Sequence, residues 1–245
     1  MDWRFFYRGL KARYRDERTE LRALTQALSP DQTAIDVGAN KGSYLWSLSR
    51  AVPQGRVVAF EPQPALAQYL REACSSAGLT NVTIEEAGCS SKTGTLTLAV
   101  PGKSESSPGA SFEASVAGRE DCRLIEVRTY ALDDYFPSAD ERIGALKIDV
   151  EGHELAVLKG AVRLIADHRP TIVCECEQRH LTAGTVRDVI DFVLSMEYRG
   201  FFCAKGGLQP ASMFDPEKHQ KQSGDRFWDA PDYYNNFVFK PAARR

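Results

Sequence analysis

Residues 33–42 read Thr-Ala-Ile-Asp-Val-Gly-Ala-Asn-Lys-Gly, and they give the clearest indication of the fold. Its first five residues predict a short buried strand, and the glycines that follow allow the backbone to turn tightly and approach a ligand closely. The spacing is Gly-x-Asn-x-Gly rather than the Gly-x-Gly-x-x-Gly of pyrophosphate-binding loops. Asp36 adds a carboxylate just before the turn, which favours a cationic ligand over a pyrophosphate.

Strands and helices alternate on the C-terminal side of this turn. Strands are predicted at 56–60, 82–86, 145–150, 171–176, 200–204 and 236–240, with helices at 43–51, 64–77, 154–166 and 185–196. This order predicts an α/β fold with a doubly wound, mostly parallel seven-stranded sheet and helices on both faces. Two further alternating segments, 94–100 and 124–130, are typical of half-exposed strands.

Length and charge narrow the class of protein. The 245 residues fit one domain with its own core, and the net charge of −2 gives no global attraction to nucleic acid. No apolar run is long enough for a membrane span.

The six cysteines lack zinc-finger spacing, and Cys174 and Cys176 are expected to be reduced thiols in the core. Because the first residues do not resemble a signal peptide, we expect a cytoplasmic location.

The first 28 residues differ from the rest in charge. They hold seven basic and four acidic side chains, with apolar residues at helical spacing. We expect a helical extension over 1–30 and a main domain over 31–245. A helix with a solvated basic face that caps the domain is the favoured interpretation. The alternative is an arm that contacts an anionic surface, a substrate or a second copy of the chain.

Acidic residues stand where the predicted strands end. Glu61 ends the second strand, 23 residues after Gly38, where a carboxylate can accept hydrogen bonds from both hydroxyls of a ribose. Asp36, the glycine turn and Glu61 together indicate a ligand of the adenosine type.

The turn after residue 148 contains the densest group of charged residues. Asp149 lies inside a predicted apolar strand, where an unpaired carboxylate is costly, and Glu151, His153 and Glu154 follow it closely. Asp149 and Glu151 are therefore candidates for function, whereas Glu154 could simply stabilise a helix N-terminus. The next strand ends in a second acidic group that could hold Mg²⁺, although no compact ligand pattern supports a metal there. This second group consists of Glu175, Glu177 and His180.

Three segments together resemble the FkbM-family methyltransferases, which are class I enzymes dependent on S-adenosylmethionine. They are Ile35-Asp-Val-Gly-Ala-Asn-x-Gly42, Ala59-Phe-Glu-Pro62 and Leu146-Lys-Ile-Asp-Val-Glu-Gly-x-Glu154. The resemblance covers residues 33–178, and it implies that Asp36, Gly38, Asn40 and Gly42 line the methionine end of the cofactor. It also implies that Glu61 holds the ribose, that Ala87 lies near the adenine, that Asp149 faces the sulfonium and that Glu151 lies toward the acceptor.

The resemblance implies methyl transfer to a hydroxyl of a small acceptor, expected to be a sugar or a natural-product intermediate, with S-adenosylhomocysteine as product. A neutral alcohol needs a base, and the candidates are Asp149, Glu151 and His153, in that order. A bound Mg²⁺ could take the place of that base. The alternatives are an amine acceptor, a nicotinamide-dependent oxidoreductase and a cofactor-binding module without catalysis.

Two polar insertions, 101–121 and 205–234, carry aromatic side chains that could form either a lid over the acceptor or an anchor to the core. These are Phe112, Met213, Phe214, Phe227, Trp228, Tyr233 and Tyr234.

Overall fold

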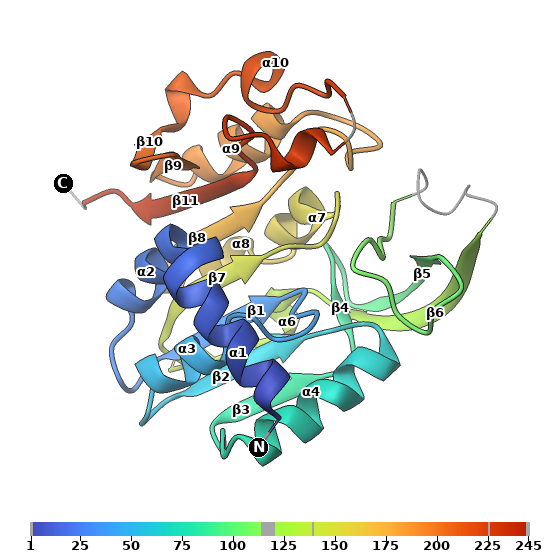
Figure 1. Cartoon of the computed structure of the whole chain (residues 1–245). Helices are drawn as coiled ribbons and strands as arrows, with labels where there is room; N and C mark the ends of the chain where they lie inside the picture. The colour runs from blue at the N-terminus through green and yellow to red at the C-terminus, as the bar shows by residue number, and fades with distance from the viewer. Residues whose placement is uncertain (1, 114–120, 139, 225, 244–245) are drawn as a thin grey trace.

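A mixed sheet in the strand order β10-β9-β11-β8-β7-β1-β2-β3 runs through the molecule (Figure 1). The computed structural model describes residues 2–113, 121–138, 140–224 and 226–243. Five neighbouring strands are parallel, and β11 pairs antiparallel with both β8 and β9. Because β1 stands between β2 and β7, successive connections leave it in opposite directions, and a crevice forms at the carboxyl ends of these strands.

The strands of this sheet are β1 (Thr33–Val37), β2 (Arg56–Phe60), β3 (Val82–Glu85), β7 (Ile143–Ile148), β8 (Thr171–Glu175), β9 (Tyr198–Ala204), β10 (Gly207–Pro210) and β11 (Asn236–Pro241). The helices of the main domain are α3 (Leu45–Ala51), α4 (Pro64–Ser76), α6 (Leu132–Tyr135), α7 (Glu154–Lys159), α8 (Val162–His168), α9 (Val186–Leu194) and α10 (Pro216–His219). The predicted doubly wound fold is confirmed, but the sheet has eight strands rather than seven, because β10 folds back on β9 as an antiparallel edge strand.

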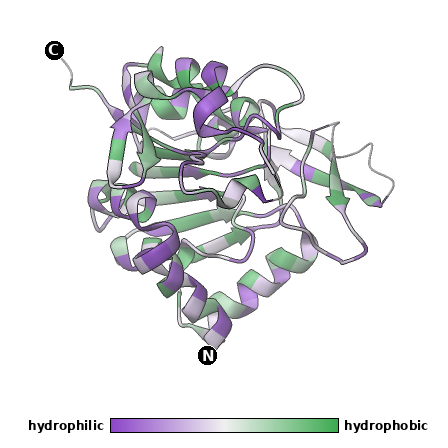
Figure 2. Cartoon of the chain, turned by 45° about the horizontal axis from the view of Figure 1, so that its top comes forward, coloured by the Kyte–Doolittle hydropathy of each residue, from purple (hydrophilic) through white to green (hydrophobic). Residues whose placement is uncertain are grey.

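Both faces of the central strands are buried, because every residue of β1 and β7 is buried. Figure 2 shows the hydrophobic strands in green between partly purple helices. Alternate strand residues point to opposite faces. Ile35 and Val58 join a core with residues of α6–α9, whereas Ala34 and Val57 join a second core with residues of α3 and α4. This double burial explains why the strands read as nearly continuous apolar runs.

Cys174 and Cys176 both belong to the core on the α6–α9 side, and both are free thiols. Their burial in one core agrees with the prediction, although Cys176 follows the end of β8 at Glu175, and the reduced state of both thiols stays a prediction.

The single helix predicted over 154–166 is wrong, because the chain forms α7 and α8 with a break at Gly160. A side chain at Gly160 would meet the carbonyl oxygen of Ser90 at 2.1 Å, so the backbone must pass closely there. Asp133 then starts the second helix, since its carboxylate accepts hydrogen bonds from the amides of Arg163 and Leu164. This cap comes from a residue 30 positions away, which helical spacing cannot indicate.

A smaller sheet stands beside the main one, at the right of Figure 1. It contains β4 (Gly88–Cys89), β6 (Cys122–Tyr130) and β5 (Gly94–Pro101) in that order. The two predicted half-exposed strands are therefore present, and together they form an antiparallel pair. Part of the insertion between them, residues 114–120, lies outside the described residues.

The N-terminal segment forms α1 (Trp3–Lys11), a π-helical turn (Ala12–Asp16) and α2 (Arg18–Ala27). Asp2 caps α1 by accepting from the amides of Arg4 and Phe5. Phe5 and Leu24 are buried in the core shared with α3 and α4, so the predicted helical extension packs on the sheet. The predicted division at residue 30 stays a prediction.

Among the residues described, no helix combines the length and the apolar character that crossing a membrane requires.

Candidate active site

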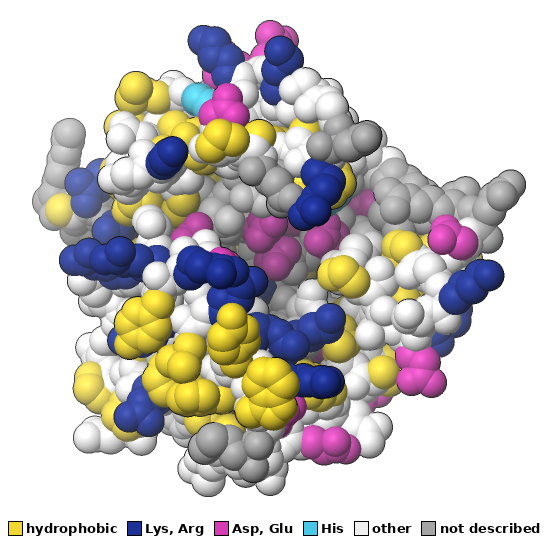
Figure 3. Space-filling view, viewed as in Figure 1, with side chains coloured by type: hydrophobic (Ala, Val, Ile, Leu, Met, Phe, Trp, Pro, Cys, Tyr) yellow, Lys and Arg dark blue, Asp and Glu magenta, His cyan; other side chains and the backbone are white. Residues whose placement is uncertain are grey.

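A cavity opens at the carboxyl ends of β1, β2 and β7, and with its open mouth it contains about 510 Å³ of empty space. Its lining includes Gly38 and Asn40 after β1, Glu61 after β2, and Asp149 and Glu151 after β7. Figure 3 shows a hollow on this side of the molecule with acidic side chains around it. The structure thus brings together the two groups of residues that the sequence predicted at separate strand ends.

The glycine turn lets β7 end directly against β1. Gly38 has φ +78°, and a Cβ at this position would lie 1.8 Å from the carbonyl oxygen of Asp149. The amide of Asp149 in turn donates to Val37. Gly42 also has φ +78°, but a Cβ there would meet Phe5, and Gly42 is absent from the cavity lining among the described residues. Gly38 therefore shapes the cavity, whereas Gly42 allows helix packing beneath it.

Glu61 closes one end of the cavity. Its carboxylate accepts hydrogen bonds from the backbone N–H groups of Asn40 (2.7 Å) and Gln63 (3.0 Å). Burial raises the pKa of Glu61 to about 7, although these two hydrogen bonds favour the charged form. The side-chain oxygen of Asn40 is buried with no hydrogen-bond partner within the described part of the chain. The cavity therefore offers at least two acceptors for the hydroxyls or amines of a ligand.

Lys147 is the residue that sequence reasoning missed. Its ammonium lies 3.0 Å from the carboxylate of Asp36 and 3.7 Å from that of Asp149, and it donates to the carbonyl oxygen of Gly38 at 2.8 Å. Burial alone would lower the pKa of Lys147, but Asp36 and Asp149 outweigh it and raise the pKa. The ion pair holds the turns after β1 and β7 in one arrangement.

The carboxylate of Asp36 therefore points toward the ammonium group of Lys147. The side chain of Asp36 is fully buried and does not belong to the cavity lining. Asp36 and Lys147 face each other in the register of β1 and β7. Two opposite charges in neighbouring apolar strands are the feature that could have indicated this pair.

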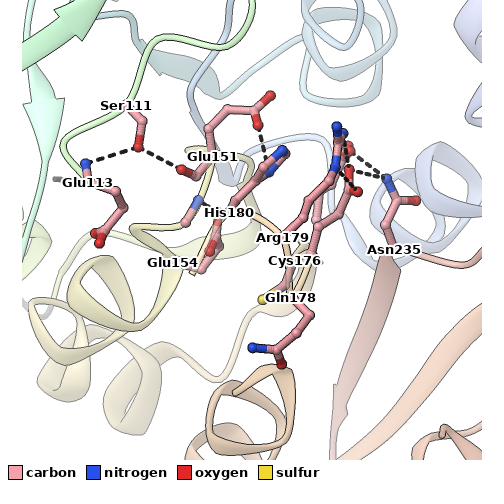
Figure 4. A network of polar contacts seen from close by, with 12 residues as sticks. Ser111, Glu113, Glu151, Glu154, Cys176, Gln178, Arg179, His180 and Asn235 are labelled. Carbon is pink, nitrogen blue, oxygen red and sulfur yellow. Dashed lines mark hydrogen bonds and ion pairs between the residues drawn. The ribbon is translucent and has the colours of Figure 1, made fainter. Parts of the chain in front are cut away.

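Asp149 and Glu151 supply the acidic side of the cavity. Burial raises the pKa of Asp149 to about 6, with Lys147 opposing the shift and Glu151 adding to it. The carboxylate of Glu151 lies 2.7 Å from Nδ1 of His180 (Figure 4). The backbone carbonyl oxygen of Glu151 accepts a hydrogen bond from the hydroxyl of Ser111. Glu151 has φ 54°, a left-handed conformation that non-glycine residues rarely adopt. These partners hold that conformation at the edge of the cavity.

His153 lies beside this cavity rather than in its lining. Its Nε2 is 2.9 Å from the hydroxyl of Ser90, and its Nδ1 is 3.1 Å from the carboxylate of Glu113. Both ring nitrogens are thus engaged, and the role of His153 as a base stays a prediction.

Two members of the second acidic group, Glu175 and Glu177, contact the C-terminal insertion, whereas the third, His180, pairs with Glu151 of the first group. Glu175 accepts from the side-chain amide of Asn235 at 2.7 Å, and Glu177 pairs with Arg179 at 2.6 Å and with the hydroxyl of Tyr233. Figure 4 shows Arg179 and Asn235 on the same side of this network. Within the described ranges, no group of three or more His, Cys, Asp or Glu side chains is arranged to hold a metal ion. The Mg²⁺ alternative stays untested.

Ala87 is buried in the core, and the next two residues, Gly88 and Cys89, line the cavity instead. The predicted adenine contact thus falls within a segment that does border the cavity.

The aromatic residues of the two insertions lie in different surroundings, and the lid stays a prediction. Phe112 lines the cavity and packs against His153. Phe214 is buried and packs against Phe237 of β11, as expected of an anchor. Further along, Phe227, Trp228 and Tyr233 gather around the Arg179–Glu177 pair.

Comparison with known proteins decides the family. Residues 36–202 match the family model described as the methyltransferase FkbM domain, a range that contains every segment of the cavity named above. The chain belongs to this family. The family resemblance predicted from the sequence is therefore confirmed.

Two curated relatives of this FkbM chain are methyltransferases. Methyltransferase sdnD of Sordaria araneosa is 36% identical over 152 residues, which cover 51% of this chain and 59% of that protein. Hexuronic acid methyltransferase AglP of Haloferax volcanii is 31% identical over 147 residues, which cover 60% of this chain and 56% of that protein. The matched regions thus span less than two thirds of either relative.

The crystal structure of methyltransferase FkbM from Methylobacillus flagellatus shares the fold. The TM-score is 0.55 at 18% identity, over 86% of this chain and 44% of that one.

Proposed function

We propose that this chain transfers a methyl group from S-adenosylmethionine to a hydroxyl of a small polyhydroxylated acceptor, such as a sugar or a natural-product intermediate. One observation carries the proposal. A single cavity joins Asn40 and Glu61, which suit a nucleoside, to Asp149 and Glu151, which suit a base. Membership of a methyltransferase family favours this reaction over nicotinamide-dependent oxidation.

The residues present fit the cofactor. Glu61 is a buried carboxylate on the cavity wall, where it can accept hydrogen bonds from both hydroxyls of a ribose. Asn40 belongs to the same lining, and its side-chain oxygen, which has no partner among the described residues, can accept from an amine. The negative charge of Asp149 and Glu151 complements a sulfonium. When bound, S-adenosylmethionine supplies the methyl group, and the protein supplies its position and electrostatics.

Asp149 is the favoured base. A neutral alcohol is a poor nucleophile, and a base whose pKa lies near the working pH removes its proton most efficiently. The raised pKa of Asp149, about 6, is nearer to neutrality than that of an ordinary aspartate, yet it leaves the group mostly ionised at pH 7 and above. Glu151 lies at the same cavity edge, oriented by His180.

The acidic lining also supports an amine acceptor as a second candidate. Asp149 and Glu151 would attract a protonated amine and repel a carboxylate placed beside them. The name of the relative AglP supports a sugar acceptor. A hexuronic acid would have to keep its carboxylate away from these two side chains.

Titration calorimetry with S-adenosylhomocysteine tests the cofactor site. We expect Glu61→Gln to weaken binding by at least about tenfold, because the charge-assisted hydrogen bonds to the ribose are lost. Glu72→Gln, at an exposed position of α4, is the matched control. Repeating the titration with Mg²⁺ shows whether a metal takes part. Binding that Glu61→Gln leaves unchanged would contradict the assigned cofactor site.

Transfer of labelled methyl groups to a panel of neutral sugars, hexuronic acids and amines tests the reaction. We expect Asp149→Asn to lower kcat by at least about a hundredfold with cofactor binding retained. Since the active form is the carboxylate, the wild-type rate should rise with pH through about 6 and then level off. His153→Ala should cost much less, because its ring lies outside the cavity lining. A larger loss for His153→Ala than for Asp149→Asn would reverse this assignment.

A further inference from the structure

The outward face of α1 and the turn that follows it carries a stripe of large apolar side chains. Trp3, Tyr7, Leu10 and Tyr14 follow one another at intervals of four, three and four residues, which places them on one side of a helix. Trp3, Tyr7 and Tyr14 are 67%, 57% and 69% exposed. The opposite side of the helix, with Phe5, is buried against the domain. The helix therefore has two apolar faces. One packs on the domain, and the other is exposed.

Basic side chains flank the stripe. Residues 3–18 hold six Lys or Arg and two acidic residues, and one of these two, Glu17, has a carboxylate oxygen buried away from solvent. The other, Asp16, pairs with Lys11 and Arg15. Figure 3 shows the yellow side chains of this patch over α1, with a row of dark blue ones beside them. Since the whole chain has a net charge of −2, this face is locally positive on an otherwise acidic protein.

A groove next to the stripe extends the positive surface. Arg13, Arg18 and Arg22 line it together with the ring of Tyr14. Arginine guanidinium groups bind phosphates in two-pronged geometry, and an aromatic ring beside them suits the boundary between water and lipid.

We propose that α1 and the following turn dock this protein on an anionic lipid surface. Exposed Trp and Tyr side chains flanked by Lys and Arg are the composition of a helix that lies in a membrane interface. The charge argues against a second copy of the chain as the occupant, because two such faces would bring like charges together. The docking face adjoins the acidic hollow in Figure 3, so the cavity mouth and the lipid contact lie on one side of the molecule.

Sedimentation of the full chain with vesicles tests the docking. One set of vesicles is phosphatidylcholine alone, and the other contains phosphatidylglycerol as well. We expect binding to the anionic set to exceed binding to the neutral set by at least about tenfold, and to weaken as salt is raised. The triple variant Trp3→Ala, Tyr7→Ala, Tyr14→Ala and the double variant Arg4→Glu, Arg18→Glu should each lose this preference.

Met213→Ala with Leu124→Ala is the matched control, because it removes exposed apolar side chains elsewhere and should bind as the wild type does. Thermal unfolding confirms that each variant is folded. Equal binding of both vesicle types, no binding of either, or full binding by the triple variant would overturn the proposal. Sedimentation equilibrium tests the alternative occupant of this face, a second copy of the chain. A wild-type dimer that the triple variant converts to monomer, without vesicle binding, would make this face an interface between copies.

Discussion

Lys147 is the only charged side chain of β7, and its burial is explained by the two carboxylates that meet it. A lone buried charge is costly, whereas a paired one with further hydrogen bonds is tolerated. Asp36 and the carbonyl oxygen of Gly38 supply those partners. At the scale of the residue, this ion pair sets the position of Asp149 at the cavity.

Lys147→Met should destabilise the protein by about 3–5 kcal/mol, because it leaves the fully buried Asp36 unpaired. Adding Asp36→Leu should recover much of that loss, since it removes the fully buried carboxylate and leaves only Asp149, whose side chain is 30% exposed, without its cation. Urea unfolding measures both. The exposed pair of Arg142 and Asp31 is the control, and Arg142→Met should cost less than about 1 kcal/mol. Equal costs for Lys147→Met and Arg142→Met would contradict the role given to this buried pair.

At the scale of the element, the turn between β1 and α3 depends on a close backbone approach as well as on its conformation. Gly38 and Gly78 both have positive φ, +78° and +69°. A Cβ at Gly38 would collide with the backbone of Asp149, whereas no atom lies within 4 Å of a Cβ at Gly78, as far as the described residues extend.

Gly78→Ala should therefore cost about 1 kcal/mol, from left-handed strain alone. Gly38→Ala should cost at least about 3 kcal/mol, because β7 must also move away. It should abolish binding of S-adenosylhomocysteine as well, whereas Gly78→Ala should leave binding unchanged. Thermal unfolding and calorimetry check the pair. If both variants lost the same stability, left-handed backbone strain would explain the whole cost, and the close approach of Gly38 to the backbone of Asp149 would add nothing.

At the scale of the whole molecule, the N-terminal helices complete the core on one side of the sheet. Phe5 and Trp3 lie on the same helix, and they are 1% and 67% exposed. We expect Phe5→Ala to cost about 3–5 kcal/mol, as for other buried aromatic residues. Trp3→Ala should change stability by no more than about 0.5 kcal/mol. Urea unfolding in a single transition would show one cooperative unit, whereas a separate early transition that Phe5→Ala alone shifts would show an independent extension.

The fold and the location of the site were largely predictable because they depend on local patterns. Glycine turns, apolar strands and acidic residues at strand ends can all be recognised in the sequence. As expected from their positions at strand ends, Asn40, Glu61 and Asp149 line one cavity. The break at Gly160 was not predictable, because it depends on Ser90 and Asp133, both distant in sequence. The exclusion of Asp36 and His153 from the lining was hidden for the same reason.

The alternation of strands and helices, the glycine turn after β1 and the family were predictable, because each follows from residues close together in the chain. Which charged groups face the cavity depends on contacts between segments that are distant in the sequence. The pairing of Asp36 with Lys147, of Glu151 with His180 and of His153 with Glu113 joins segments as much as 111 residues apart. A buried charge must find its counter-charge in space, and the linear order of residues does not state which one it will meet.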